Sequence, residues 1–423
     1  MLRILVIGAV LGALAAIVPM ASSAADLSGE SRTYLQFRES ESGDKLLPIY
    51  EYLNFSVQNT GKAEISFHVG GWLRYDLRDD SFGKDKNSDL QYAYLSYRHK
   101  EANAVVTVGR IMVFEGVAAE RVDGVYARTD LKKGFEVSAY AGASVLTNEG
   151  DDSGTNTIYG ARAAHSKDGL YTIGLSYLKQ EKNSTDFREE EGLDLWVRPT
   201  RSVEIMGRSA YNAQADGWMQ HAYNILLGPF AKVRLNAELS RTNYEYYFDG
   251  TTNTAFIFTP GGTVDPKEKL DLAGLTASYP VTDKVNVSLD IKKYDYTIAG
   301  SANYFGASAR YAPSKDMAAG LSLHRMDGAT DRLSYDEYRL YGTKRYGKAN
   351  VAVDLLQVKY QEAINGVSNA SSATLAAGYD LSEKLMLGAD LEYAKNPDFD
   401  KEVRVFLKLI YRFQAPLGKG KGV

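Results

Sequence analysis

The sequence is dominated by an alternation of apolar and polar residues with a period of two. The last segment shows it most clearly, with one face made of Val403, Val405, Leu407, Leu409, Tyr411 and Phe413. The same alternation recurs in residues 385–393, 373–381, 285–291 and 233–239. Because successive side chains of a β-strand point to opposite faces, each segment predicts a strand with one apolar face.

These segments approach the roughly 9–11 residues that a tilted membrane strand needs. In lipid every backbone donor and acceptor must be paired, so such a sheet has to close, with its apolar face outward and its charged face inward. An Arg or Lys on the lipid face at mid-depth would cost roughly 2–4 kcal/mol. The residues that we therefore expect in the lumen are Arg234, Glu238, Asp290, Lys292, Asp390, Glu392, Arg404 and Lys408. Their mixed signs predict weak ion selectivity.

The connections between the segments fall into two interleaved sets. The short ones carry Gly, Pro, Asp or Ser, and lie at 59–62, 132–134, 166–169, 199–202, 281–284, 313–316, 346–348 and 382–384. The longer ones lie at 79–88, 145–156, 181–189, 249–267 and 361–371. Short periplasmic turns and longer extracellular loops are typical of transmembrane β-barrels. We predict one all-β, closed antiparallel barrel of about 22 strands (range about 18–24). The alternative is a secreted β-propeller, whose strands would be shorter and whose connections would not alternate.

The N-terminal segment is typical of a secretory signal peptide. Arg3 precedes an apolar run from Ile4 to Val18, and the small residues Ser22 to Ala25 follow. We predict a cleaved signal peptide over residues 1–25, a barrel over 26–413 and a flexible basic periplasmic tail over 414–423. The apolar run is shorter than the roughly 20 residues of a spanning helix. Export and a barrel together predict the outer membrane of a Gram-negative bacterium.

The composition restricts the chemistry available to these 423 residues. Cysteine is absent, which excludes disulfides, thiolate metal sites and covalent c-type haem in this chain, so we expect no cofactor here. The net charge of −4 gives no electrostatic footprint for nucleic acid. Tyrosine (30) outnumbers Phe (15) and Trp (3), a bias suited to a membrane interface.

Residues 108–125 resemble a hairpin of porin-like outer-membrane proteins, with Gly109-Arg110 on one strand and Val122-Asp123-Gly124-Val125 on the other. In the porin family the third surface loop folds into the channel and narrows it. The resemblance implies a constriction formed by Arg110, Glu115, Glu120, Arg121 and Asp123. The loop is apolar where the other loops are acidic, which agrees with an inward position. The alternative is an ion-pair cluster at the barrel rim.

The whole chain also resembles the barrel component of porin–cytochrome conduits of metal-reducing bacteria. That resemblance implies a sheath around a multihaem c-type cytochrome, supplied as a separate chain for extracellular electron transfer. Two functions therefore stay open: a channel for small hydrophilic solutes, and a structural scaffold for such a cytochrome. Outer-membrane lipid and lipopolysaccharide are expected partners of either.

Enzymatic motifs are not found in the sequence. It contains no G-x-S-x-G, H-E-x-x-H or P-loop pattern and no visible Ser–His constellation, so we expect no enzyme. No histidines are spaced as a metal pair, so we expect no metal site. We expect several of the histidines to lie in the lumen, in contact with water. They are His68, His99, His165, His221 and His324.

Overall fold

The computed structural model describes residues 25–39, 43, 45–59, 64–79, 84–99, 101–145, 156–248 and 267–417. Apart from turns, loops and short helices, these residues form strands of one antiparallel sheet. The strands are β1 (Ala25–Glu39), β2 (Lys45–Leu46), β3 (Pro48–Asn59), β4 (Glu64–Asp76), β5 (Lys86–His99), β6 (Ala104–Glu115), β7 (Ala118–Asp130), β8 (Phe135–Ser144), β9 (Asn156–Lys167), β10 (Tyr171–Lys182), β11 (Thr185–Thr200), β12 (Val203–Asn212), β13 (Gly217–Phe230), β14 (Val233–Asn243), β15 (Lys269–Pro280), β16 (Val285–Tyr296), β17 (Gly300–Ser314), β18 (Met317–Gly328), β19 (Tyr335–Tyr346), β20 (Ala349–Ile364), β21 (Val367–Asp380), β22 (Leu385–Asn396) and β23 (Phe399–Pro416). The helical turns are η3 (Lys132–Gly134), α2 (Tyr244–Phe248) and η6 (Asp331–Leu333). No helix among the described residues is long and apolar enough to cross a membrane.

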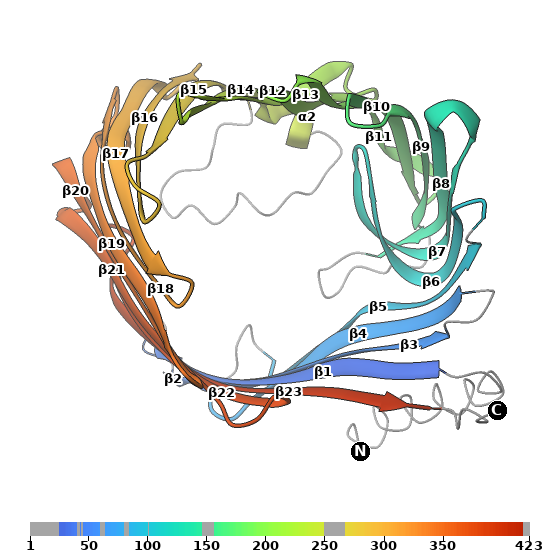
Figure 1. Ribbon diagram of the computed structural model, residues 1–423, viewed down its shortest axis with the longest axis horizontal. Helices are drawn as coiled ribbons and strands as arrows, with labels where there is room; N and C mark the ends of the chain where they lie inside the picture. Colours follow the sequence, from blue (N-terminus) through green and yellow to red (C-terminus); the bar gives the residue numbers. More distant parts are fainter. Residues whose placement is uncertain are drawn as a thin grey trace.

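The sheet closes on itself. Each wall strand pairs with the next, and β23 returns to β1 in a register that runs from Asp26↔Pro416 to Arg38↔Arg404. The two-residue β2 pairs only with the end of β1, at Arg38↔Leu46 and Glu39↔Lys45, so 22 of the 23 strands make up the wall. Figure 1 shows the resulting ring. The structure confirms the predicted closed antiparallel barrel of 22 strands.

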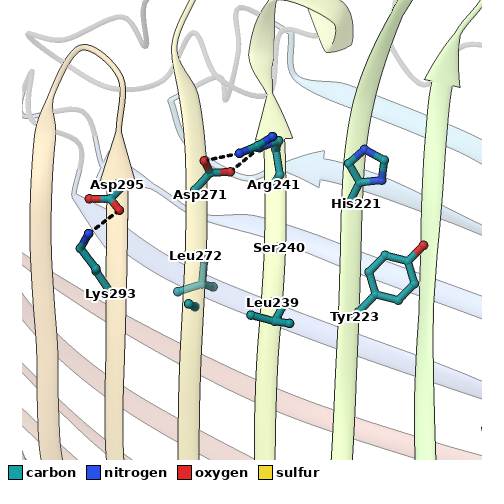
Figure 2. Close-up of a pocket in the computed structure, with 10 residues that line it drawn as sticks. His221, Tyr223, Leu239, Ser240, Arg241, Asp271, Leu272, Lys293 and Asp295 are labelled. Carbon is teal, nitrogen blue, oxygen red and sulfur yellow. Dashed lines mark hydrogen bonds and ion pairs between the residues drawn. The ribbon is translucent and has the colours of Figure 1, made fainter.

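The alternation assigns the two faces of the wall. Figure 2 views β13–β16 from outside, with the strands of the far wall behind them, and shows Tyr223 and Leu239 on the outer face. The side chains of Leu289 and Ile291, 63% and 61% exposed, share that face with Lys293. Their neighbours in the sequence, including Lys292, therefore point into the lumen. The outer face is an apolar band, and the inner face is polar.

Two predicted loops are instead tight turns. Strand β10 continues to Lys182 and β11 begins at Thr185, while β20 continues to Ile364 and β21 begins at Val367. The turn residues Asn183, Ser184, Asn365 and Gly366 all have positive φ, which is typical of two-residue type I′ hairpins. The predictions of loops at 181–189 and 361–371 are therefore wrong. The predicted loops at 145–156 and 249–267 lie largely outside the described residues, and so do residues 80–83 of the predicted loop at 79–88.

The chain ends differ a little from the predicted boundaries. Residues 1–24 of the predicted signal peptide lie outside the described residues, and β1 begins at Ala25. Strand β23 continues beyond Phe413 to Pro416, so the start of the predicted tail is paired with β1. Residues 418–423 lie outside the described residues. The start of β1 and the end of β23 lie on the same rim of the barrel, which we call the terminus rim.

One hairpin leaves the wall. Strand β5 pairs with β6 only from Ala93↔Arg110 to His99↔Ala104, and β7 pairs with β8 only from Val122↔Ser144 onward. Beyond Ile111↔Val122 the ladder joins β6 and β7 only to each other, from Met112↔Arg121 to Glu115↔Ala118, and the Arg121 carbonyl accepts a backbone hydrogen bond from Val145. Figure 1 shows β6 and β7 curving into the ring beside β8–β11. We call residues 111–121 the inner hairpin.

Candidate functional site

The tip of the inner hairpin lies against the inner wall. The backbone N–H of Val117 donates to the Ser176 hydroxyl on β10 at 3.1 Å. Gly116 has a φ of +59°, and a Cβ added there would lie 2.2 Å from the Cβ of Ser176. A Cβ on Gly192 of β11 would lie 2.3 Å from a methyl group of Val117. Glycine at positions 116 and 192 is what permits this close approach.

An apolar cluster fixes the hairpin to the wall. Ile111, Val113, Ala118 and Val122 pack against three inward-facing residues of β8–β10: Tyr140, Ile158 and Leu178. Ile158 and Leu178 are fully buried, although the inner face of this barrel is otherwise polar. Burying one such side chain contributes roughly 1.5–3 kcal/mol. The inner wall therefore carries a docking patch that matches the hairpin.

Ion pairs made by Glu120 and Arg121 of β7 also hold this hairpin. Arg188 of β11 donates to Glu120 at 2.5 Å and to Glu190 at 2.9 Å. Arg121 donates to Asp89 of β5 at 2.5 Å. Glu190 is only 2% exposed, so loss of Arg188 would leave a buried carboxylate without its cation. The hairpin is thus tied to β5 on one side and to β11 on the other.

The five residues predicted at a constriction fall into three groups. Glu120 and Arg121 anchor the inner hairpin, as described above. Glu115 accepts a hydrogen bond from the Tyr126 hydroxyl at 2.5 Å on the lumenal side. Arg110 and Asp123 form a two-pronged ion pair, both contacts 2.7 Å, on the same side of the strands as the exposed Val108 and Val125. The structure places that last pair on the outer face at the base of the hairpin, and a constriction role for the five stays a prediction.

The eight predicted lumenal charges lie on the inner face by the parity of their strands, and most face an opposite charge. Lys292 donates to Glu238 at 2.9 Å, and Lys408 pairs with Asp390. Arg404 lies 4.0 Å from Glu392 and donates to Glu402 at 2.6 Å. Arg234 occupies an inward position of β14, two residues before Asn236. Opposite charges on neighbouring strands leave the inner wall close to electrically balanced.

Asp290 and His324 belong to a cluster that the sequence pattern did not reveal. His324 Nε2 lies 3.3 Å from Asp290, and its Nδ1 lies 3.7 Å from Glu337. The imidazole stacks on Tyr304 with ring centroids 4.9 Å apart. Asp290 also accepts a hydrogen bond from Thr276 at 2.7 Å. These residues come from five neighbouring strands, β15–β19, so the register was needed to bring them together.

The structure also brings a serine and a histidine together, a contact that the sequence pattern did not reveal. Ser209 Oγ lies 2.8 Å from His221 Nδ1 and 2.6 Å from the Tyr223 hydroxyl. His221 and Tyr223 lie on the outer face, beside the ion pairs Arg241–Asp271 and Lys293–Asp295 (Figure 2). Ser209 is 5% exposed and its hydroxyl is shared between two partners, so the cluster serves to satisfy polar groups at the edge of the apolar band.

Known proteins add a fold likeness. No protein-family model matches the chain, and no curated protein is similar to it in sequence. Among solved structures, OccK8 (OprE) of Pseudomonas aeruginosa is 10% identical, with a TM-score of 0.46 over 93% of this chain and 98% of that one. The outer membrane protein OprD of the same organism is 10% identical, with a TM-score of 0.44 over 93% and 96%. OpdK, also an outer membrane protein of that organism, is 10% identical, with a TM-score of 0.44 over 92% and 99%. Function is therefore argued from this chain's own residues.

Proposed function

We propose that this protein is a porin-like channel in the outer membrane of a Gram-negative bacterium, and that it passes small hydrophilic solutes. One observation carries the proposal: the closed wall is apolar outside and ion-paired inside, and the chain's own hairpin is fixed within the lumen. A polar inner face is stable only against water or a polar occupant. The terminus rim would then face the periplasm.

The dimensions of the wall support a membrane position. Apart from β2, the strands are 10 to 18 residues long, which meets the roughly 9–11 residues of a tilted membrane strand. Large apolar side chains such as Leu289 are exposed on the outer face and would be covered by lipid. Outer-membrane lipid and lipopolysaccharide are therefore the partners that we propose, with no cofactor and no enzymatic reaction in this chain.

A sheath around a multihaem cytochrome is the alternative. Barrels near 22 strands are typically plugged, which favours an occupant of the lumen. The inner hairpin takes up part of that lumen, and its anchors on β5, β10 and β11 favour the channel. Haem staining of the protein purified from its native membrane separates the two functions. Reproducible co-purification of a haem protein would support the sheath, and a barrel that isolates alone would oppose it.

Reconstitution in planar bilayers tests the channel directly. We expect stepwise conductance in potassium chloride from protein that migrates differently on a denaturing gel before and after boiling, as closed barrels do. The gel shift is the folding control, because only a closed barrel resists the detergent. Folded protein that inserts in the bilayer and carries no current would contradict the channel.

A further inference from the structure

Aromatic residues cover one sector of the inner wall. They lie on β1, β3, β4 and β5, and they are Tyr34, Tyr50, Tyr52, His68, Trp72, Tyr92 and Tyr94. Each occupies an inward position. Trp72, for example, alternates along β4 with Leu73 and with Tyr75, which is exposed on the outer face, and the register pairs Trp72 with Tyr52. We call these seven residues the aromatic track.

Neighbouring rings of the track are close enough to form one surface. The Tyr34 and Tyr52 centroids lie 5.6 Å apart, and Tyr52 lies 6.5 Å from Trp72. Nearer the terminus rim, the Tyr92 and Tyr94 ring centroids lie 5.9 Å apart, and the His68 ring stacks on Tyr94 with centroids 4.8 Å apart. Gly70 lies between the two groups, and the Tyr92 ring occupies the space of its missing side chain.

The track extends along the strands, away from one rim and toward the other. Tyr34 pairs with Tyr50 toward the rim opposite the terminus rim, and His68 pairs with Ser56, six residues further along β3. At about 3.3 Å per residue this is about 20 Å of strand. A solute moving through the lumen would meet several rings in succession.

The end of the track nearer the terminus rim opens into a cavity of about 600 Å³. Its walls include His68, Tyr92 and Tyr94 on one side and Met112 and Phe114 of the inner hairpin on the other. Phe114 is 70% exposed, although large apolar side chains are unusual in a polar lumen. Known ligand pockets have volumes of roughly 300–1,000 Å³ and are largely apolar with a few polar groups. Here Ser96, Thr107, Glu115 and Arg128 supply those polar groups.

The rest of the inner wall has a different chemistry. The described part of β14–β23 presents paired charges to the lumen, such as Glu238–Lys292 and Asp390–Lys408. Because most of these charges have a counter-ion nearby, this sector can form hydrogen bonds without strongly favouring a charged solute. The lumen therefore has one aromatic sector and one hydrogen-bonding sector of low net charge.

We propose that the aromatic track binds short oligosaccharides of pyranose rings, as the preferred solutes of the channel proposed above. A pyranose ring has an apolar face of C–H groups, which packs on an aromatic ring, and a rim of hydroxyls, which seeks donors and acceptors. Successive sugar units would match successive rings over the length of the track. The inference rests on the proposed channel for its biological role, whereas binding itself does not require conduction.

Binding of maltohexaose to the purified barrel, measured by calorimetry, tests the track. We expect the double variant Tyr52→Ala/Trp72→Ala to bind about tenfold more weakly, because two ring contacts are lost. The variant Trp72→Phe, which keeps a ring, should retain most of the affinity. The matched control is Tyr75→Ala, which removes an aromatic residue from the outer face of the same strand and should leave binding unchanged.

Three results would contradict sugar binding by the aromatic track. They are no maltohexaose binding by the folded wild-type protein, a loss of affinity in Tyr75→Ala equal to that in the double variant, and tighter binding of the charged aromatic 4-hydroxybenzoate than of the sugar. Heat-dependent gel migration confirms that each variant is folded, and Tyr92→Ala replaces the double variant if that protein does not fold. In bilayers, maltohexaose should reduce the open-channel current. Sugar binding without current would support the aromatic track and contradict the channel. Current without sugar binding would support the channel and contradict the track.

Discussion

Glu51 is a carboxylate on the outer, apolar face of the barrel. It pairs in register with Leu73 of β4 and lies between Ile49 and Leu53 on its own strand. Hydroxyl groups of the adjacent strand β1 bind it, with Ser31 and Thr33 each donating at 2.6 Å. These two hydrogen bonds explain how a charge is tolerated where the surrounding residues are apolar.

Replacing this polar group by apolar side chains should stabilise the barrel. We expect the triple variant Ser31→Ala/Thr33→Val/Glu51→Leu to gain about 1–2 kcal/mol, because no polar atom remains to be desolvated on the outer face. Glu51→Leu alone should gain less, since it leaves two hydroxyls without their acceptor. The measurement is the urea midpoint of unfolding in detergent, followed by gel migration. A less stable triple variant would show that this patch has a polar partner.

The inner hairpin occupies part of the lumen, against the inner wall. Its tip depends on Gly116, which has a φ of +59° and no room for a Cβ beside Ser176. Gly347, in the turn between β19 and β20, has nearly the same φ of +58°, and nothing lies within 4 Å of the Cβ position. The two glycines thus share a backbone conformation and differ in their surroundings.

This pair gives a matched test of the hairpin's position. We expect Gly116→Val to push the hairpin off β10 and to raise the single-channel conductance, by roughly twofold if the hairpin leaves the lumen. Gly347→Val carries the same left-handed backbone strain, about 1–2 kcal/mol, and should not change the conductance. Equal conductance in both variants would mean that the hairpin does not limit the current.

At the scale of the whole molecule, the balance of charge on the inner wall would set the ion selectivity of the proposed channel. Lys408 pairs with Asp390 across β22 and β23 in the lumen, and Lys293 pairs with Asp295 on the outer face. We expect the wild-type reversal potential in a salt gradient to stay near zero. Lys408→Ala should shift it toward cation preference, because Asp390 then faces the pore without its counter-ion. Lys293→Ala makes the same charge change outside the pore and should leave the potential unchanged. A shift of equal size in both variants would exclude a local lumenal effect.

Much of this barrel could be predicted from the sequence, because a period of two is a local property of the chain. Residues 403–413 predicted a strand and its two faces, and the structure places Arg404 and Lys408 in the lumen. The even number of strands followed from counting turns. The hairpin turn at Asn365-Gly366 was also readable, since Asn-Gly is the strongest two-residue turn signal, but the residues around it were assigned to a loop.

Only the tertiary structure decided which distant residues meet. Val117 lies against Ser176, 59 residues further along the chain, and Ile158 and Leu178 are apolar on an inner face because the hairpin covers them. Alternation cannot distinguish such a patch from lipid-facing positions, since both are apolar. The aromatic track likewise needs the register of four strands to bring Tyr34 beside Tyr52 and Trp72. Strands and faces follow from neighbouring residues, whereas the contents of the lumen follow from how the closed wall brings distant side chains together.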